Sequence, residues 1–180
     1  MENMLYVPLV SGDISLEPLA EQHREELRVA CAQDHEIWQI YPVCYLAAHF
    51  DPNFDLMING PPQRCCYAIR AADEVVGMTA WLEDNPVFGS VEIGNSFIVP
   101  RLRGTGFNRR LKHLMLDHAF GCGYRRLVFK VDEINNRSQA ALVKLGCVKE
   151  GVLRAEKPTW TGRIRNTVIF SILADEWPHC

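Results

Sequence analysis

Hydrophobic residues in this chain recur with a period of two in some segments and of three to four in others, and these patterns predict where strands and helices lie. Strands are predicted over residues 13–19, 64–71, 74–84, 87–99, 125–132, 147–155 and 165–177. Helices are predicted over residues 21–34, 105–122 and 135–146. The segment 35–63 mixes aromatic residues with prolines and predicts one or two short helices joined by loops. Ala72-Asp73 is predicted to be the tight turn between two paired strands.

Strand 87–99 and the helix that follows it are the clearest of these elements. Its apolar positions alternate with small or polar ones, which predicts one apolar face, formed by Val91, Ile93, Phe97 and Val99, and one face formed by Glu92, Gly94 and Ser96. The unit from residue 87 to 132 is predicted to be a right-handed crossover between parallel strands. The order of elements therefore predicts one α/β domain over residues 1–180, with a mixed, mostly antiparallel central sheet flanked by helices.

Composition narrows the classes of protein that this domain could represent. The chain has 180 residues, 48% of them hydrophobic, and a formal net charge of -3, which disfavours nucleic-acid binding driven by overall charge. It contains neither a long apolar run nor a secretory signal pattern, so we expect no membrane association. The seven cysteines are odd in number and scattered, which favours reduced thiols and a cytoplasmic location. His113 and His118 lie five residues apart and do not have the spacing of a metal site.

The segment "IVPRLRGTG" carries the strongest candidate chemistry. The first N–H groups of a helix lack partners within the helix, and the helix dipole favours an anion there. Gly104 and Gly106 would let a phosphate approach the backbone, and Arg101 and Arg103 would add charge. A second phosphate could be reached by three further cations, Arg109, Arg110 and Lys112.

Three other interpretations of this segment compete with a phosphate site, and the sequence fails to match two of them. A glycine turn with a solvated basic face explains R-x-x-G-x-G, taken alone, equally well. A dinucleotide fingerprint would need glycine where Arg109 stands, and no P-loop pattern is present.

Two motifs resemble the GNAT superfamily of acyl-coenzyme A-dependent N-acetyltransferases. The first is R-x-x-G-x-G at residues 101–106, and the second is "VDEINNRSQAALVKLGCVKEGVLR" at 131–154. The second is similar to the RimJ/RimL-like branch in the positions Asp132, Asn135, Arg137, Ser138, Ala141, Leu145, Gly146, Glu150, Gly151, Leu153 and Arg154. The resemblance covers roughly residues 10 to 178, and segment 35–63 matches only loosely.

This resemblance implies acetyl-coenzyme A as the co-substrate and no metal. Its pantetheine arm would lie between two splayed strands, 87–99 and 126–132. The implied cofactor contacts are Ile98, Val99, Arg101, Arg103, Gly104, Thr105, Gly106, Arg109, Asn135 and Ser138.

The resemblance also implies catalytic roles for Glu92 and Ser138. Glu92 would accept the proton of the amine, and the alternative is a structurally paired glutamate. Many GNAT enzymes place a tyrosine where this chain has Leu142, so the thiolate would be met by Ser138 instead. The alternative role of Ser138 is to satisfy backbone N–H groups at the helix start. Asp132 is expected to fix the strand end, and Glu150 and Arg154 to form an ion pair.

The acceptor is predicted to be a small-molecule or peptide amine, with a protein N-terminal amine favoured by the resemblance. Trp38, Tyr41 and Trp160 are candidates for lining its pocket, with core packing as the alternative for each. Two other functions stay open: a non-catalytic module that binds coenzyme A or acyl-coenzyme A, and, less favoured, a nucleotide-binding redox enzyme. The sequence leaves a homodimer open.

Overall fold

The computed structural model describes residues 4–61 and 64–178. In this part of the chain, eight strands form one sheet in the order β1-β2-β3-β4-β5-β6-β8-β7. The strands are β1 (Leu9–Ser11), β2 (Ile14–Pro18), β3 (Cys65–Ala71), β4 (Glu74–Asn85), β5 (Ser90–Ile98), β6 (Arg126–Asp132), β7 (Val148–Pro158) and β8 (Ile164–Leu173). Neighbouring strands are antiparallel except β5 and β6, which are parallel. The predicted mixed, mostly antiparallel sheet is therefore confirmed.

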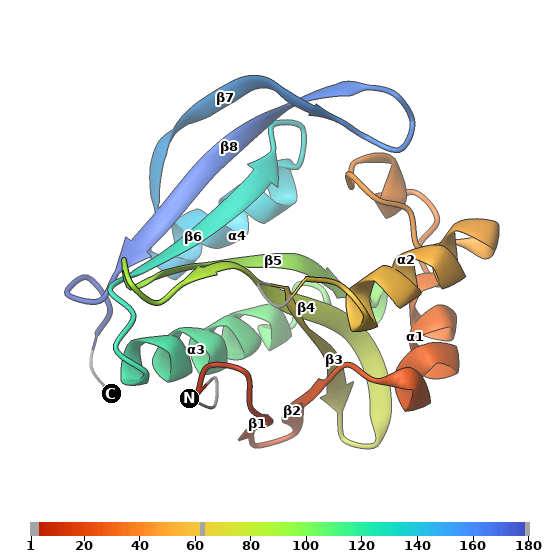
Figure 1. Ribbon diagram of the computed structural model, residues 1–180, viewed down its shortest axis with the longest axis horizontal. Helices are drawn as coiled ribbons and strands as arrows, with labels where there is room; N and C mark the ends of the chain where they lie inside the picture. Colours follow the sequence, from red (N-terminus) through yellow and green to blue (C-terminus); the bar gives the residue numbers. More distant parts are fainter. Residues whose placement is uncertain (1–3, 62–63, 179–180) are drawn as a thin grey trace.

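Helices flank the sheet on both faces (Figure 1). They are α1 (Arg24–Cys31), α2 (Phe50–Ile58), α3 (Phe107–Gly121) and α4 (Asn136–Leu145). Helix α3 packs on one face, where Thr79 of β4 contacts Met115. On the opposite face, Phe97 of β5 stacks against Trp38, in the segment between α1 and α2. The apolar positions that predicted these helices are buried in a core that includes Trp38, Trp81, Tyr45, Tyr67, Phe50 and Phe54.

Several predicted element boundaries differ from the structure. The short edge strand β1 was not predicted, and it pairs with the predicted first strand across a turn at Gly12. The last strand ends at Leu173 rather than 177, because residues 174–176 turn so that Trp177 packs against His113 of α3. Glu150 binds Arg126 rather than the predicted Arg154, because the two long side chains project from strands on either side of β8.

A β-bulge at Asn95 changes the facing of the second half of β5. Ala80 pairs with Gly94 but Met78 pairs with Phe97, so β5 has one residue more than β4 over this stretch, and Asn95 takes a φ of 48°. The extra residue reverses the alternation of side chains. Ser96 consequently contacts Lys112 of α3, whereas Phe97 faces Trp38. The prediction that Phe97 shares a face with Val91 and Ile93 is wrong for this reason.

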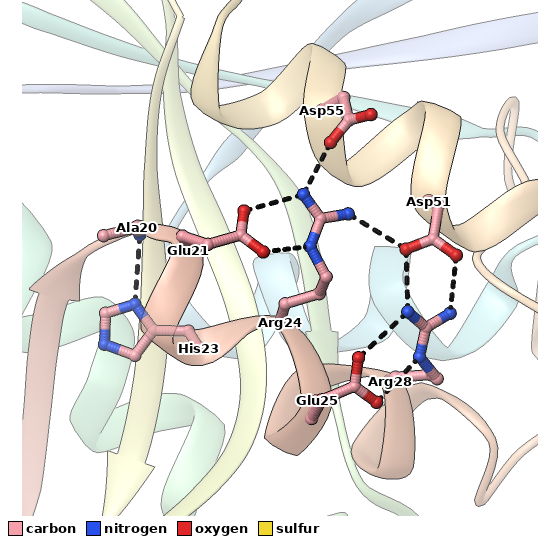
Figure 2. Close-up of polar contacts among 8 residues, drawn as sticks. All are labelled: Ala20, Glu21, His23, Arg24, Glu25, Arg28, Asp51 and Asp55. Atoms are coloured by element: carbon pink, nitrogen blue, oxygen red, sulfur yellow. Dashed lines mark hydrogen bonds and ion pairs between the residues drawn. The ribbon is translucent and has the colours of Figure 1, made fainter.

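A network of ion pairs joins α1 to α2 (Figure 2). Asp51 accepts hydrogen bonds from Arg24 at 2.9 Å and from Arg28 at 2.7 Å, and Arg24 also reaches Asp55 at 2.6 Å. The two guanidinium groups lie 4.3 Å above the ring of Phe54 and 4.4 Å above that of Phe50. The network therefore fixes α2, and with it the preceding loop, against the rest of the fold.

We expect this network to give stability a measurable pH dependence. Hydrogen bonds from Arg28 and Arg24 hold the pKa of Asp51 below its usual value. The stabilisation that ionised Asp51 gives to the folded state is therefore fully present above the unfolded-state pKa. It is lost as pH falls through the lowered pKa of the folded state. Asp51→Asn should lower the melting temperature at pH 7 and flatten its decline in acid, as followed by circular dichroism. Asp55→Asn, which removes a single contact to Arg24, is the matched control and should have the smaller effect.

Candidate active site

The candidate site is a cleft between β5 and β6. The two strands pair at only three positions, from Ser90 opposite Arg126 to Glu92 opposite Val128, and then diverge (Figure 1). A cavity of about 550 Å³ occupies the opening. Its walls also include the loop before α3, one side of α4, and residues of β7, β8 and the 40–45 segment. The predicted splayed strand pair is therefore present.

The glycine loop at one end of this cavity has the backbone geometry of an anion cradle. Gly104 and Gly106 line the cavity and take φ values of +79° and +87°, which L side chains rarely adopt. Within the described residues, nothing accepts a hydrogen bond from the backbone N–H groups of Gly104, Thr105, Gly106, Asn108 and Arg109. These donors precede and begin α3, where the helix dipole favours negative charge.

The predicted arginines around the loop are engaged differently from one another. Arg103 lines the cavity, but it binds Asp34 and donates to the carbonyl oxygen of Ile98 at 3.0 Å. Arg101 does not line the cavity and pairs with Glu74 at 2.5 Å, while Arg110 pairs with Asp13. Arg109 is exposed and lines the cavity, and among the described residues its side chain hydrogen-bonds to His113 alone, at 3.4 Å. Arg109 is thus the arginine of this group whose charge is not already matched by a carboxylate.

Three other predicted cofactor residues take distinct positions. Ile98 lines the cavity at the end of β5. Val99 is fully buried, and its N–H donates to the carbonyl oxygen of Val76, so its backbone donor is occupied. The Thr105 hydroxyl donates to Leu102 and accepts from the N–H of Phe107, which holds the loop in shape.

Lys112, another of the predicted cations, lines the same cavity. Its side chain points inward, is 5% exposed, and donates to the Ser96 hydroxyl at 2.7 Å. Burial lowers the pKa of this ammonium group to about 7. Lys112 thus faces the cavity from the buried side of α3, and its contact with a second phosphate stays a prediction.

Glu92 lies on β5 where the strands begin to separate, and it is 7% exposed. Burial raises its pKa, and the ammonium group of Lys130, 3.0 Å away, opposes this effect. Lys130 also binds the exposed Glu83 at 2.6 Å. A Cβ at Gly94 would lie 2.9 Å from Glu92 Oε1, so the glycine keeps room for the carboxylate. The site thus holds a carboxylate that takes up protons more readily than an exposed glutamate.

Asn135 and Ser138 lie at the start of α4, and both line the cavity. Asn135 caps the helix, because its Oδ1 accepts from the N–H of Ser138 at 3.1 Å. The Ser138 hydroxyl itself has no hydrogen-bond partner among the described residues, so it is not used as a cap. Asp132 fixes the end of β6, as predicted, by accepting from the N–H of Ile134 and pairing with Arg163.

The far side of the cavity is formed by the 40–45 segment and by β7 and β8. Tyr41 lines it as predicted, and Tyr45, Arg165 and Lys157 line it although the sequence did not single them out. Trp38 is instead buried in the core, and Trp160 packs outside the cavity against His49. Trp160 donates to the carbonyl oxygen of Trp38 at 2.6 Å, so the tip of the β7–β8 hairpin is joined to the 38–42 segment.

Residues 4–61 and 64–178 contain no group of three or more side chains that could together hold a metal ion. None of the helices described combines the length and hydrophobicity needed to cross a bilayer. Free thiols in these residues include Cys31, Cys44, Cys66, Cys122 and Cys147, and Cys180 lies outside the described part of the chain.

Known proteins agree with this geometry. Residues 13–148 match the acetyltransferase (GNAT) domain family. A probable acetyltransferase of the GNAT family from Chromobacterium violaceum is 28% identical, with a TM-score of 0.88 over 96% of this chain and 88% of that one. No protein with curated annotation is significantly similar in sequence.

More distant structures share the fold alone. Ribosomal-protein-S5-alanine acetyltransferase from Vibrio fischeri is 16% identical, with a TM-score of 0.75 over 96% of this chain and 100% of that one. Spermidine N-acetyltransferase from Vibrio cholerae, solved with CoA and spermine, is 18% identical, with a TM-score of 0.74 over 92% of this chain and 98% of that one.

A domain match over most of the chain, on a sheet that opens between β5 and β6 beside a glycine cradle, defines the class of protein. The chain belongs to the GNAT acetyltransferase family.

Proposed function

We propose that this protein transfers an acetyl group from acetyl-coenzyme A directly to a primary amine. The observation that carries the proposal is one cavity with unpaired backbone N–H groups at one end and the buried carboxylate of Glu92 within it. The first feature suits a pyrophosphate and the second suits removal of a proton. The GNAT match and the CoA in the spermidine acetyltransferase structure support the same co-substrate.

The proposed binding mode follows from the contacts already described. Amides of residues 104–109 hold the pyrophosphate, Arg109 supplies charge, and the pantetheine arm runs along the open edge of β5 past Ile98 towards Asn135. Arg101, Val99 and Thr105 support the loop and strand from outside the cavity. Arg103 orients the end of β5 through its bond to Ile98 and through Asp34.

In the proposed reaction, Glu92 takes a proton from the ammonium form of the acceptor, and the free amine attacks the thioester carbonyl carbon. The C–N bond forms to give a tetrahedral intermediate whose nitrogen carries one surplus proton. As the C–S bond breaks, that proton passes to the departing sulfur, which leaves as the thiol of coenzyme A. The Ser138 hydroxyl is proposed to donate to that sulfur, because its donor is uncommitted. Leu142, which lines the cavity, can supply no proton.

Ser138→Ala should lower kcat about 10-fold, within the range of one lost hydrogen bond to a charged group, while leaving CoA affinity unchanged. It should also leave the melting temperature nearly unchanged, because the hydroxyl is not a cap. Steady-state kinetics and isothermal titration calorimetry measure these quantities. Asn135→Ala is the contrasting variant, since it removes the cap and should lower stability by about 1 kcal/mol. A Ser138→Ala enzyme with full kcat would remove Ser138 from the mechanism.

The finer assignments are also proposals. The motif at 131–154 resembles the RimJ/RimL-like branch, which supports an N-terminal protein amine as acceptor, with cytoplasmic action supported by the free thiols. The single continuous sheet supports one domain over residues 1–180.

A thiol-release assay with acetyl-coenzyme A and a panel of amines and peptides tests the transferase proposal. Release that requires both an amine and Glu92 supports it. Tight CoA binding without release for any acceptor would support a non-catalytic binding module instead.

A further inference from the structure

Arg165 is a buried cation in the acceptor half of the cavity that the proposed reaction does not use. It is 5% exposed and lines the cavity beside Lys157, its partner in the register of β7 and β8. Its Nε donates to the Thr167 hydroxyl at 2.7 Å. Nothing in the described part of the chain accepts a hydrogen bond from its two terminal nitrogens or forms an ion pair with it. No fully buried side-chain nitrogen or oxygen of the described residues lacks a partner, so these two nitrogens open onto the cavity, where an anion would complete their hydrogen bonds.

The strand register places Arg165 on the same face of the sheet as Glu92. Glu92 is opposite Val128 of β6, and Lys130 and Asp132 follow on that face at two-residue spacing. Asp132 is opposite Thr167 of β8. Arg165 lies two residues before Thr167 and therefore on the same face. The unpaired guanidinium therefore faces the same side as the proposed base, beyond the end of β6.

The carboxylates near Arg165 are each committed to another group. Asp132 binds Arg163 at 2.5 Å, and Glu92 binds Lys130 at 3.0 Å. Glu156 binds Lys157 at 3.1 Å and accepts from Thr167 at 2.6 Å. Burial lowers the pKa of Arg165, and these three carboxylates offset the effect only in part. The local acids thus leave the guanidinium short of a counter-charge.

We infer that Arg165 binds a carboxylate of the acceptor, so that the substrate is a primary amine that also carries a carboxylate group. This inference rests on the proposed function and names the class of its acceptor. A guanidinium presents two parallel N–H donors that match the two oxygens of a carboxylate. The same arrangement disfavours polyamines, whose second charge is positive. The carboxylate could belong to a free amino acid or to an acidic residue near a peptide N-terminus.

The test compares acceptors that differ only in the carboxylate. One arm uses a peptide amide with Ala-Asp at its N-terminus against the same peptide with Ala-Asn. The other uses alanine against alaninamide, with rates referred to the concentration of neutral amine. Spermidine is the cationic comparison. In the wild-type enzyme, kcat/KM should favour the carboxylate of at least one pair by about 10- to 100-fold, the range of one charge-assisted contact. The arm that shows the preference identifies the source of the carboxylate.

Arg165→Met should abolish that preference, mainly through KM, and Arg165→Lys should keep part of it. Arg154→Met, an exposed arginine on the neighbouring strand outside the cavity, is the matched control and should keep the wild-type ratio. Melting curves establish that each variant is folded, and Arg165→Lys serves if Arg165→Met is not.

Two results would overturn the inference while leaving the transferase intact: equal or better turnover of neutral or cationic acceptors by the wild type, or an equal loss for both members of a pair in Arg165→Met. Absence of thiol release with every amine would instead contradict the proposed function. In that case, the Ala-Asp and Ala-Asn peptides are titrated into the CoA complex by calorimetry. Tighter binding of the Ala-Asp peptide that is lost in Arg165→Met would support the inference, and equal binding of both peptides would overturn it.

Discussion

Gly104→Val should weaken coenzyme A binding by about 100-fold or more, equivalent to about 2.7 kcal/mol at 25 °C. An added side chain at residue 104 meets nothing within 4 Å in the protein, so it would extend into the space that the phosphate is proposed to occupy. The φ of +79° also strains a β-branched residue. If the backbone changes conformation to relieve that strain, the unpaired N–H groups no longer point towards one place. Isothermal titration calorimetry with coenzyme A measures the loss.

Gly123→Val is the control that separates strain from obstruction. Gly123 follows the other end of α3, has a φ of +88° and likewise has nothing within 4 Å of an added Cβ. Both variants should lose similar stability, about 1–3 kcal/mol for a strained backbone position, but only the one at residue 104 should lose affinity. Unchanged affinity in Gly104→Val, or an equal loss in both variants, would argue against the cradle.

Glu92→Gln should lower kcat about 100-fold or more, the usual contribution of a positioned general base. Burial raises the pKa of Glu92, and only the ionised carboxylate accepts a proton. Activity of the wild type should therefore rise with pH through that raised pKa, and the variant should lose this limb of the profile. Its deficit should shrink at high pH, where the acceptor amine is already neutral. Stopped-time thiol-release assays between pH 5 and 10 measure both profiles.

Glu83→Gln is a well-matched control for this result. Glu83 binds the same Lys130 but lies on the solvent side, with 69% of its side chain exposed. If Glu92 acts only by balancing the charge of Lys130, the two variants should behave alike. A large loss confined to Glu92→Gln, with the acid limb removed, is the result expected of a base. An unaltered pH profile would exclude that role.

The sequence predicted those parts of the site that local rules determine. Gly104 and Gly106 before an amphipathic helix are sufficient to predict a turn with free N–H groups, since no other part of the fold is needed for them. Asn135 was likewise predictable as a cap, because the acceptor and its donor lie three residues apart.

Other features depend on contacts between distant segments, and these were missed. The Asn95 bulge is set by pairing with β4, so alternation within β5 alone could not reveal it. Arg103 is directed by Asp34, which lies 69 residues earlier in the chain. Arg165 was not singled out, because its burial near the start of β8 depends on contacts that the pattern of the strand alone does not show. The burial of Lys112 was likewise not predicted, because a charged residue is rarely assigned to the inward side of a helix.

The attachment of Trp160 to the 38–42 segment has a geometric consequence for access. Through the bonds from Trp160 to Trp38 and Pro42, the hairpin tip is tied to the segment that places Tyr41, Pro42 and Val43 in the cavity wall. An acceptor must fit beside a wall that is held in place at this point, and we expect this to favour a free chain terminus or a compact metabolite over a lysine in the middle of a folded helix. We therefore expect exclusion by size and shape to select among amines before any charged group does.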